Sequence, residues 1–251
     1  MKVIHIDRNN TELPVVVPDS ILIFAPHPDD ELLSCGGTIL KYKNWGTKIY
    51  IVVSSSGIGG YSKEEYLEDI RDIRKNELEK SMSLLGVDKY YFLEFDEINP
   101  SRKYVKSFTE IIRDLRPTIV LAPHPADAHR IHRNTALVAR EAVYHAQGKA
   151  YGGYGKEWIP FSYYFYESLS CKFINTDGAH KIIVCDISEY WEEKMRIFNQ
   201  VYKSQKEMLE RVSKWAVSTA KMAGEIGGVG VKWGECFIPD TEFVNLKIIL
   251  I

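Results

Sequence analysis

The chain has 251 residues, of which 45% are hydrophobic and 26% are charged, and its formal net charge is -2. This composition is typical of an ordinary folded protein and argues against nucleic acid as a partner. The sequence contains neither the apolar stretch of a signal peptide nor a window of transmembrane length, so we expect a cytoplasmic protein without stable membrane insertion. Four widely spaced cysteines, Cys35, Cys171, Cys185 and Cys236, indicate neither a thiolate zinc site nor a disulfide framework.

The first apolar run, Ile21 to Ala25, is short and rich in β-branched residues, which predicts a buried strand of a parallel sheet. After it, Ser34, Gly36 and Gly37 predict a short turn that leads into a helix near Thr38. Further strands are predicted at 48–54, 90–93, 118–122, 163–166 and 182–184, and helices at 63–85, 105–115 and 189–211. Three residues mark helix ends in this prediction: Gly86, Pro117 and, as an N-cap, Ser188.

The alternation of strands and helices predicts an α/β fold: a Rossmann-like, mostly parallel sheet sandwiched by helices. Right-handed crossovers build the sheet one way from strand 21–25 through 48–54 to 90–93, and strand 118–122 returns to the other side of the first. Ligands bind at such a switch point, so we expect the active site at the carboxyl ends of strands 1 and 4. The sequence shows no repeat or linker, which favours a single domain over residues 1–251.

A histidine and three carboxylates, in the sequence His27-Pro28-Asp29-Asp30-Glu31, follow the first strand directly. Neutral imidazole and carboxylate oxygen are ligands of divalent cations, and a hydrolytic cation also needs a base beside its open position. The alternative is a solvated turn in which an aspartate caps the next helix, and for Glu31 alone that alternative is preferred. We interpret the cluster as a metal site because a second, histidine-rich loop leaves the fourth strand.

That second loop contains His124, Asp127, His129 and His132. His129 and His132 are three residues apart, so on a helix they lie on one face and are able to share a site. Surface histidines on a polar helix are the alternative for this pair, and for His124 a structural role is preferred. Together with His27 and Asp30, the pair offers more ligands than a catalytic cation needs, which leaves one group free for acid, base or oxyanion duty.

Two rival chemistries find no support in the sequence. A serine triad lacks a G-x-S-x-G elbow. A dinucleotide-binding domain lacks G-x-G-x-x-G after the first strand, where carboxylates would repel phosphate instead. The serine- and glycine-rich loop at 54–60 lacks the lysine and the spacing of a P-loop.

At these residues the chain resembles the PIG-L/LmbE-like family of zinc-dependent N-deacetylases. The segment Pro26 to Glu31 is similar to the family's A-H-P-D-D-E motif. Four further segments are similar to family motifs: Arg74 to Glu77 with Leu84-Leu85-Gly86 (R-x-x-E and L-G), Asp127 to His132 (D-x-H-x-D-H), Tyr202 to Gln205 (H-R-S-Q) and Val231 to Phe237 (R-Y-x-E-x-F). The resemblance covers nearly the whole chain, from about Ile21 to Phe237.

The resemblance implies that His27, Asp30 and His132 bind the metal. It also implies that Asp29 is the general base and that His129 stabilises charge in the transition state. The family has an aspartate before the last histidine where this chain has Ile131. In the family that aspartate orients the catalytic histidine, and we expect Asp127 to take over this role.

The expected activity is removal of an acyl group, with acetyl preferred, from an N-acetylglucosamine derivative or another amino-sugar glycoconjugate. One Zn²⁺ per chain is the expected cofactor, although the ligand set also accepts other divalent first-row metals. The alternatives are an amidase on a non-sugar amide such as a thiol conjugate, and a sugar-binding protein with impaired catalysis. Family members often form homo-oligomers, but the sequence identifies no interface.

Candidate substrate contacts are less specific. Arg74 is the candidate substrate-binding residue, and the alternative for it and for Arg71 is a solvated helix charge. Aromatic residues that could line a sugar cleft or simply pack are Tyr151, Tyr154, Trp158 and Trp233.

Overall fold

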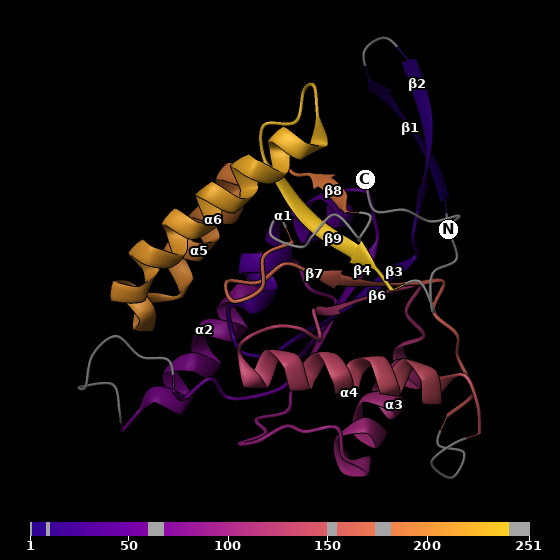
Figure 1. The fold of residues 1–251 in the computed structure, drawn as a ribbon, viewed down its shortest axis with the longest axis vertical. Coiled ribbons are helices and arrows are strands. Elements are labelled where there is room, and N and C mark those ends of the chain that lie inside the picture. The colour runs from indigo at the N-terminus through magenta and orange to yellow at the C-terminus, as the bar shows by residue number, and fades with distance from the viewer. Residues whose placement is uncertain (1, 9–10, 60–67, 150–154, 174–181, 241–251) are drawn as a thin grey trace.

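A computed structural model describes residues 2–8, 11–59, 68–149, 155–173 and 182–240. At its centre is a seven-stranded sheet with the strand order β5-β4-β3-β6-β7-β9-β8 (Figure 1). The strands are β3 (Ser20–Ala25), β4 (Lys48–Val53), β5 (Lys89–Phe92), β6 (Ile119–Pro123), β7 (Ser162–Tyr166), β8 (Ile183–Asp186) and β9 (Gly234–Pro239). The pairs from β5 through β7 are parallel, whereas β9 runs antiparallel to both β7 and β8. The predicted α/β fold with a mainly parallel sheet is confirmed.

Strands β3 and β6 are direct neighbours, as the connection rule predicts. Ile21 pairs with Ile119 and Ile23 with Leu121 in parallel register, and β4 lies on the other side of β3. Because parallel neighbours end at the same edge of a sheet, the loops that follow β3 and β6 leave the sheet side by side. This adjacency brings the two histidine-containing segments together.

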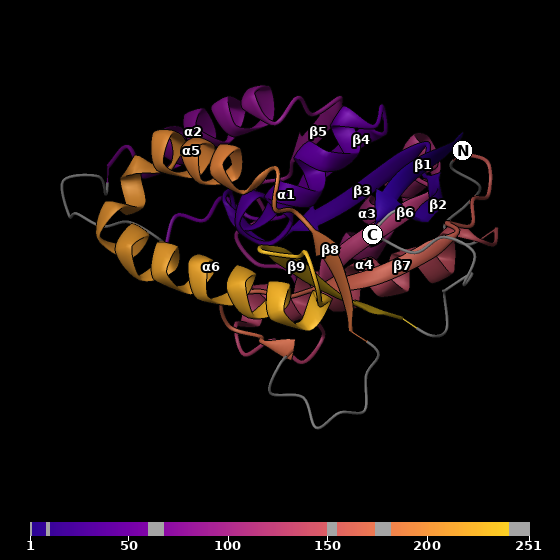
Figure 2. The ribbon, with the colours of Figure 1, turned by 90° about the horizontal axis from the view of Figure 1, so that it is seen from above.

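Helices cover both faces of the sheet (Figure 2). The helices are α1 (Asp30–Asn44), α2 (Ile70–Leu84), α3 (Arg102–Leu115), α4 (Arg130–Ala146), α5 (Trp191–Val201) and α6 (Lys206–Gly227). Alternate residues of β3 face opposite sides: Ile21 and Ile23 pack with α1, α2 and α5, whereas Leu22 and Phe24 pack with α3 and α4. Both faces of this strand are therefore buried, which explains its uninterrupted apolar sequence.

Helix α1 begins at Asp30, earlier than the predicted entry near Thr38, and therefore contains both glycines. These glycines are required by packing instead of by a turn. A Cβ atom on Gly37 would lie 2.6 Å from the side chain of Ile187. The close approach of another chain segment, which the local sequence does not reveal, is why this position is glycine.

The segment 189–211, predicted to be mostly helical, forms α5 and the beginning of α6 with a break between them. The chain breaks at Tyr202 (φ -85°, ψ 60°) and passes through a short 3₁₀ turn, η4 (Lys203–Gln205), before α6. The break is stabilised from outside the segment, because the backbone N–H and the hydroxyl of Ser204 both donate to the carboxylate of Glu77 on α2, at 2.7 Å each.

Ser188 does not occupy the predicted N-cap position, which falls on Tyr190. The Ser188 hydroxyl instead donates to Asp186 and accepts from the backbone N–H groups of Lys232 and Trp233. Ser188 therefore connects β8 to the segment before β9.

Two further differences concern elements that the sequence analysis did not predict or placed elsewhere. An N-terminal hairpin, β1 (Lys2–Arg8) and β2 (Thr11–Val17), forms a separate two-stranded sheet, and β9 completes the central sheet. Helix α2 begins at Ile70, and residues 63–67 of the predicted helix lie outside the described residues. Its end is as expected, since Gly86 follows with a φ of +66°.

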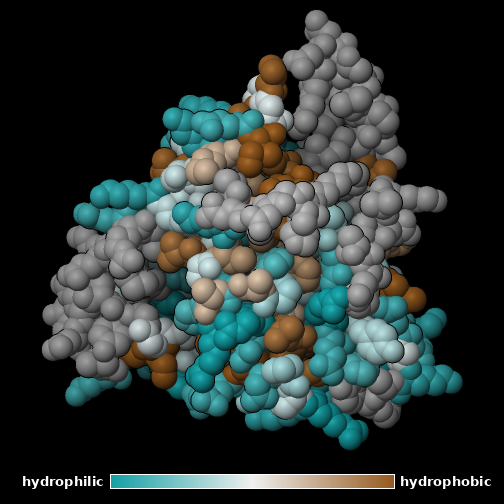
Figure 3. Space-filling view, viewed as in Figure 1, coloured by the Kyte–Doolittle hydropathy of each residue, from teal (hydrophilic) through white to brown (hydrophobic). Residues whose placement is uncertain are grey.

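On the face seen in Figure 3, mainly hydrophilic residues cover α3 and α4, with isolated hydrophobic residues between them. Within the described part of the chain, every helix is too short or too polar to cross a membrane.

Glu167, directly after β7, is a buried carboxylate with one oxygen that lacks a hydrogen-bond partner among the described residues. Burial raises the pKa of Glu167 to about 7. The folded state then binds more protons than the unfolded state between about pH 4.5 and pH 7, so this residue should lower stability as the pH rises through that range.

We expect Glu167→Gln to leave stability nearly unchanged near pH 4 and to raise it by about 3 kcal/mol at pH 8. Urea denaturation at both pH values measures this difference. Glu157→Gln, at an exposed position, controls for the loss of one negative charge. An equal gain at both pH values would contradict the explanation.

Candidate metal centre

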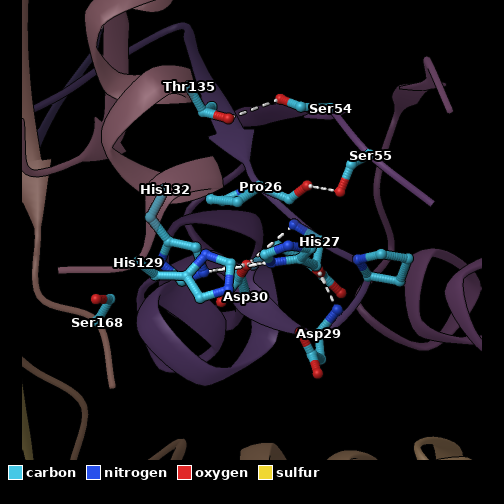
Figure 4. A network of polar contacts seen from close by, with 12 residues as sticks. Pro26, His27, Asp29, Asp30, Ser54, Ser55, His129, His132, Thr135 and Ser168 are labelled. Carbon is cyan, nitrogen blue, oxygen red and sulfur yellow. Dashed lines mark hydrogen bonds and ion pairs between the residues drawn. The ribbon is translucent and has the colours of Figure 1, made fainter. Parts of the chain in front are cut away.

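The two predicted ligand segments meet at the carboxyl edge of the sheet (Figure 4). His27 lies in the turn after β3, and Asp30 is the first residue of α1. His132 lies in the first turn of α4, which follows β6. Figure 4 shows the rings of His27, His129 and His132 gathered around the carboxylate of Asp30.

Three donor atoms form a nearly equilateral triangle. His27 Nδ1 lies 3.1 Å from Asp30 Oδ2, His132 Nε2 lies 3.3 Å from the same oxygen, and the two nitrogens are 3.2 Å apart. A tetrahedral zinc ion with bonds of about 2.0–2.1 Å holds its ligands about 3.3 Å from each other. The spacing of these three atoms therefore fits one face of a tetrahedral ion.

The charges of the ligand atoms also suit a cation. Although burial opposes ionisation, His132 and His27 lower the pKa of Asp30 well below its usual range. Burial likewise opposes a charged His132, but the carboxylates of Asp30 and Asp127 raise the pKa of this imidazole. An ionised carboxylate thus lies between two imidazoles. A divalent cation bound among the three groups would be a ligand partner for each of them.

Asp29 lies beside His27 at the start of α1 in an unusual backbone conformation. Its φ is +114° and its ψ is -32°, a conformation that residues other than glycine rarely adopt. A conformation of this kind costs on the order of 1–3 kcal/mol and persists only where the surroundings enforce it. Here the Asp29 N–H donates to Glu31 Oε2 at 3.0 Å, inside the buried base of the site.

His129 lies at the open side of the cluster. It is exposed, and its ring stands 5.0 Å from the ring of His27 and 4.7 Å from that of His132, centre to centre. Burial of its inner part and the two neighbouring imidazoles lower the pKa of His129. His129 could also supply a nitrogen to a metal, and its exposure places it on the solvent-facing side of the cluster.

Asp127 is buried and accepts hydrogen bonds from Ser168, Ser170 and the backbone N–H of His129. In addition, Oδ2 of Asp127 lies 3.1 Å from Nδ1 of His132. The structure thus places Asp127 on the ring of His132, whereas the sequence analysis expected it to orient the ring of His129. Ile131, at the position of the family's aspartate, packs against the apolar cluster beneath α4.

Ser168 and Ser170 were not predicted from the sequence as residues of the site. Both follow β7, the strand next to β6, at the same edge of the sheet. The rule that identified the other two loops, polar residues directly after a buried strand, also applies to them.

We expect Asp127→Asn to weaken metal binding by about 10- to 100-fold, because it removes the charge that holds the His132 ring with Nε2 toward the site. Competition with a chromophoric chelator measures the affinity. Asp114→Asn, an exposed partner of Lys89, serves as a control. Unchanged affinity in Asp127→Asn would contradict the orienting role.

Arg74 is enclosed in the protein, with only 2% of its surface exposed. Its Nη2 donates to the carbonyl of Pro28 at 2.6 Å, and Nη1 lies 3.6 Å from the carboxylate of Asp29. Gly57 makes room for it, since a Cβ there would lie 2.7 Å from Nη2. Arg74 thus contacts the His27–Glu31 segment from behind, and a direct contact with substrate would require this packing to open.

The aromatic candidates for a sugar cleft pack against other groups or lie outside the described residues. Trp158 donates to the carbonyl of Pro117, before β6, at the opposite edge of the sheet. Trp233 stacks on Trp191 with ring centres 4.4 Å apart. Tyr151 and Tyr154 lie outside the described residues. His124, for which a structural role was preferred, packs on Phe165 and accepts a hydrogen bond from the backbone N–H of Ala126.

Comparison with known proteins gives consistent matches. Residues 22–143 match the family PIG-L, described as GlcNAc-PI de-N-acetylase. Diacetylchitobiose deacetylase of Thermococcus kodakarensis is 33% identical over 129 residues, which cover 49% of this chain and 48% of that protein. The 1D-myo-inositol 2-acetamido-2-deoxy-alpha-D-glucopyranoside deacetylase 2 of Catenulispora acidiphila is 26% identical over 162 residues, covering 50% and 53%. The chain therefore spans about half the length of the curated relatives it matches.

Solved structures extend the likeness. The N,N'-diacetylchitobiose deacetylase from Pyrococcus horikoshii, in complex with its inhibitor MPG, aligns with a TM-score of 0.76 at 28% identity. The alignment covers 88% of this chain and 83% of that one. The likeness thus includes the part of the sheet beyond β6 that the family match does not reach.

Proposed function

We propose that this chain, whose residues 22–143 match the PIG-L family, is a metal-dependent N-deacetylase of amino sugars. The family match confirms the resemblance indicated by the motifs. The observation that carries the proposal is the triangle of His27 Nδ1, Asp30 Oδ2 and His132 Nε2, with sides of 3.1 to 3.3 Å.

Zinc is the proposed ion, one per chain, held by His27, Asp30 and His132. Two imidazoles and one carboxylate suit zinc, and other divalent first-row metals remain chemically acceptable. When bound, such an ion would lower the pKa of a water molecule from far above neutral to about 7 and polarise the amide carbonyl.

Asp29 is the proposed general base. Asp29 directly precedes the proposed ligand Asp30 and lies outside the triangle, and its carboxylate would take the proton of the attacking water. The same proton then passes to the departing amine nitrogen, from Asp29 or through His129. Arg74 is proposed to support this residue from behind, through the carbonyl of Pro28 and the Asp29 carboxylate.

His129 is proposed to stabilise the negative charge that develops on the carbonyl oxygen. A neutral imidazole retains one N–H donor, so the lowered pKa of His129 is compatible with this role. One donor of this kind typically contributes about 10²- to 10³-fold to the rate.

The proposed substrate is an N-acetylated amino sugar or glycoconjugate, since the named relatives act on diacetylchitobiose and on an acetamido-deoxyglucoside of inositol. A single deacetylase domain over residues 1–251 and a cytoplasmic location are part of the proposal.

The test is a substrate panel with the full chain, first freed of metal by a chelator and then loaded with Zn²⁺. The panel contains N-acetylglucosamine, N,N'-diacetylchitobiose, an N-acetylglucosaminyl malate and an N-acetylated thiol conjugate. Acetate and free amine are both measured. We expect equal amounts of the two from at least one amino sugar, and only in the metal-loaded protein.

Release only from the thiol conjugate would replace the sugar substrate with a non-sugar amide. Binding of amino sugars without release of acetate would indicate a protein that has lost catalysis. Equal activity of metal-free and metal-loaded protein would refute the metal-dependent mechanism.

A further inference from the structure

Asp29 is supported by residues far from it in the sequence. Its backbone N–H donates a hydrogen bond to the Glu31 carboxylate, which is fully buried. Glu31 Oε1 in turn accepts two hydroxyl groups, from Tyr202 at 2.6 Å and from Ser81 at 2.9 Å. A carboxylate that receives donors on both oxygens is held in one orientation, so its contact with the Asp29 N–H is held as well.

One face of α2 provides this support. Arg74, Glu77 and Ser81 are three and four residues apart, so they lie on the same side of the helix, and all three are buried. Arg74 donates to the carbonyl of Pro28, and Ser81 donates to Glu31. Glu77 accepts both donors of Ser204. The helix face therefore holds the peptide before Asp29 and the carboxylate that accepts its N–H.

The break between α5 and α6 completes the arrangement. Ser204 is fixed on Glu77, two residues after Tyr202, and Tyr202 is buried with its hydroxyl on Glu31. A continuous helix through this region would follow a different path past Glu31. The departure from helical geometry at Tyr202 thus coincides with the residue that reaches the site.

We propose that Tyr202 and Ser81 are positioning residues that hold Asp29 in its strained backbone conformation through Glu31. The inference rests on the proposed function in that it assigns Asp29 the role of base. The strained φ of +114° directs the Asp29 side chain, so loss of the hydroxyl donors lets the backbone relax and moves the carboxylate away from its reacting position.

The experiment uses the metal-loaded full chain with Tyr202→Phe, Ser81→Ala and the double variant. Displacement of a catalytic group by about 1 Å costs on the order of 100-fold in rate. We expect a fall in kcat of about 10-fold for Tyr202→Phe and up to about 100-fold for the double variant. KM and metal content should stay within about 2-fold of the wild type, because neither hydroxyl touches a ligand atom. Crystal structures should show the φ of Asp29 moved out of the positive region in the double variant.

Tyr163→Phe is the matched control. Tyr163 is equally buried but faces the opposite side of the sheet, so the same atom is removed without affecting Glu31. Wild-type kcat and an unchanged Asp29 conformation in the double variant would overturn the proposal, as would an equal loss of kcat in Tyr163→Phe. If the wild-type protein released no acetate from any substrate, the proposed function would fail, and the Asp29 conformation alone would decide the positioning role.

Discussion

Asp29→Asn should abolish turnover and leave the metal in place. Asparagine has the same shape but cannot accept the proton of the attacking water, and general bases typically contribute 10²- to 10⁴-fold to the rate. The metal should be retained, because the triangle of donor atoms comes from His27, Asp30 and His132. Asparagine also tolerates a positive φ, so the backbone conformation at this position should be retained.

The measurements for Asp29→Asn are kcat on the best substrate of the panel, zinc per chain by elemental analysis, and the thermal midpoint. Asp96→Asn is the control, since Asp96 is an exposed carboxylate that pairs with Arg71. Its kcat should match the wild type. Wild-type kcat in Asp29→Asn would exclude it as the base, and loss of zinc would show that its carboxylate takes part in binding the ion.

His132→Ala should lose both metal and activity. The substitution removes one of the three proposed ligand atoms and leaves two buried carboxylates, Asp30 and Asp127, without the imidazole between them. Loss of a residue that only orients a ligand typically weakens metal binding by about 10- to 100-fold. Loss of the ligand itself should therefore weaken zinc binding by more than about 100-fold.

Equilibrium dialysis against buffered zinc measures the affinity of His132→Ala, and the acetate assay at saturating zinc tests whether excess metal restores turnover. We expect no recovery at zinc concentrations that saturate the wild type. His145→Ala is the control, because His145 is on the same helix but lies near its far end, beside Glu141. Stoichiometric, tight zinc in His132→Ala would remove His132 from the ligand set.

Much of the fold followed from the sequence because the signals were strong and local. Both faces of β3 are buried, so Ile21 to Ala25 had to be a continuous apolar run. The strand order β5-β4-β3-β6 followed from the handedness of the crossovers, which does not depend on side-chain detail. The elements that the sequence analysis missed are short or defined by distant partners. Strand β9 begins at a glycine and pairs antiparallel with β7 and β8.

The same division applies to the site. The sequence alone predicted that the segments with His27, Asp30 and His132 meet, because a strand and its following loop are local features and parallel neighbours end at one edge of the sheet. The choice of these three as ligands came from the family resemblance. Only the tertiary structure decided that Asp127 contacts the ring of His132, that Arg74 is enclosed behind Asp29, and that Tyr202 reaches Glu31. The orientation of each of these side chains depends on hydrogen-bond partners from other elements, and pairing across such distances leaves no periodic signal in the chain.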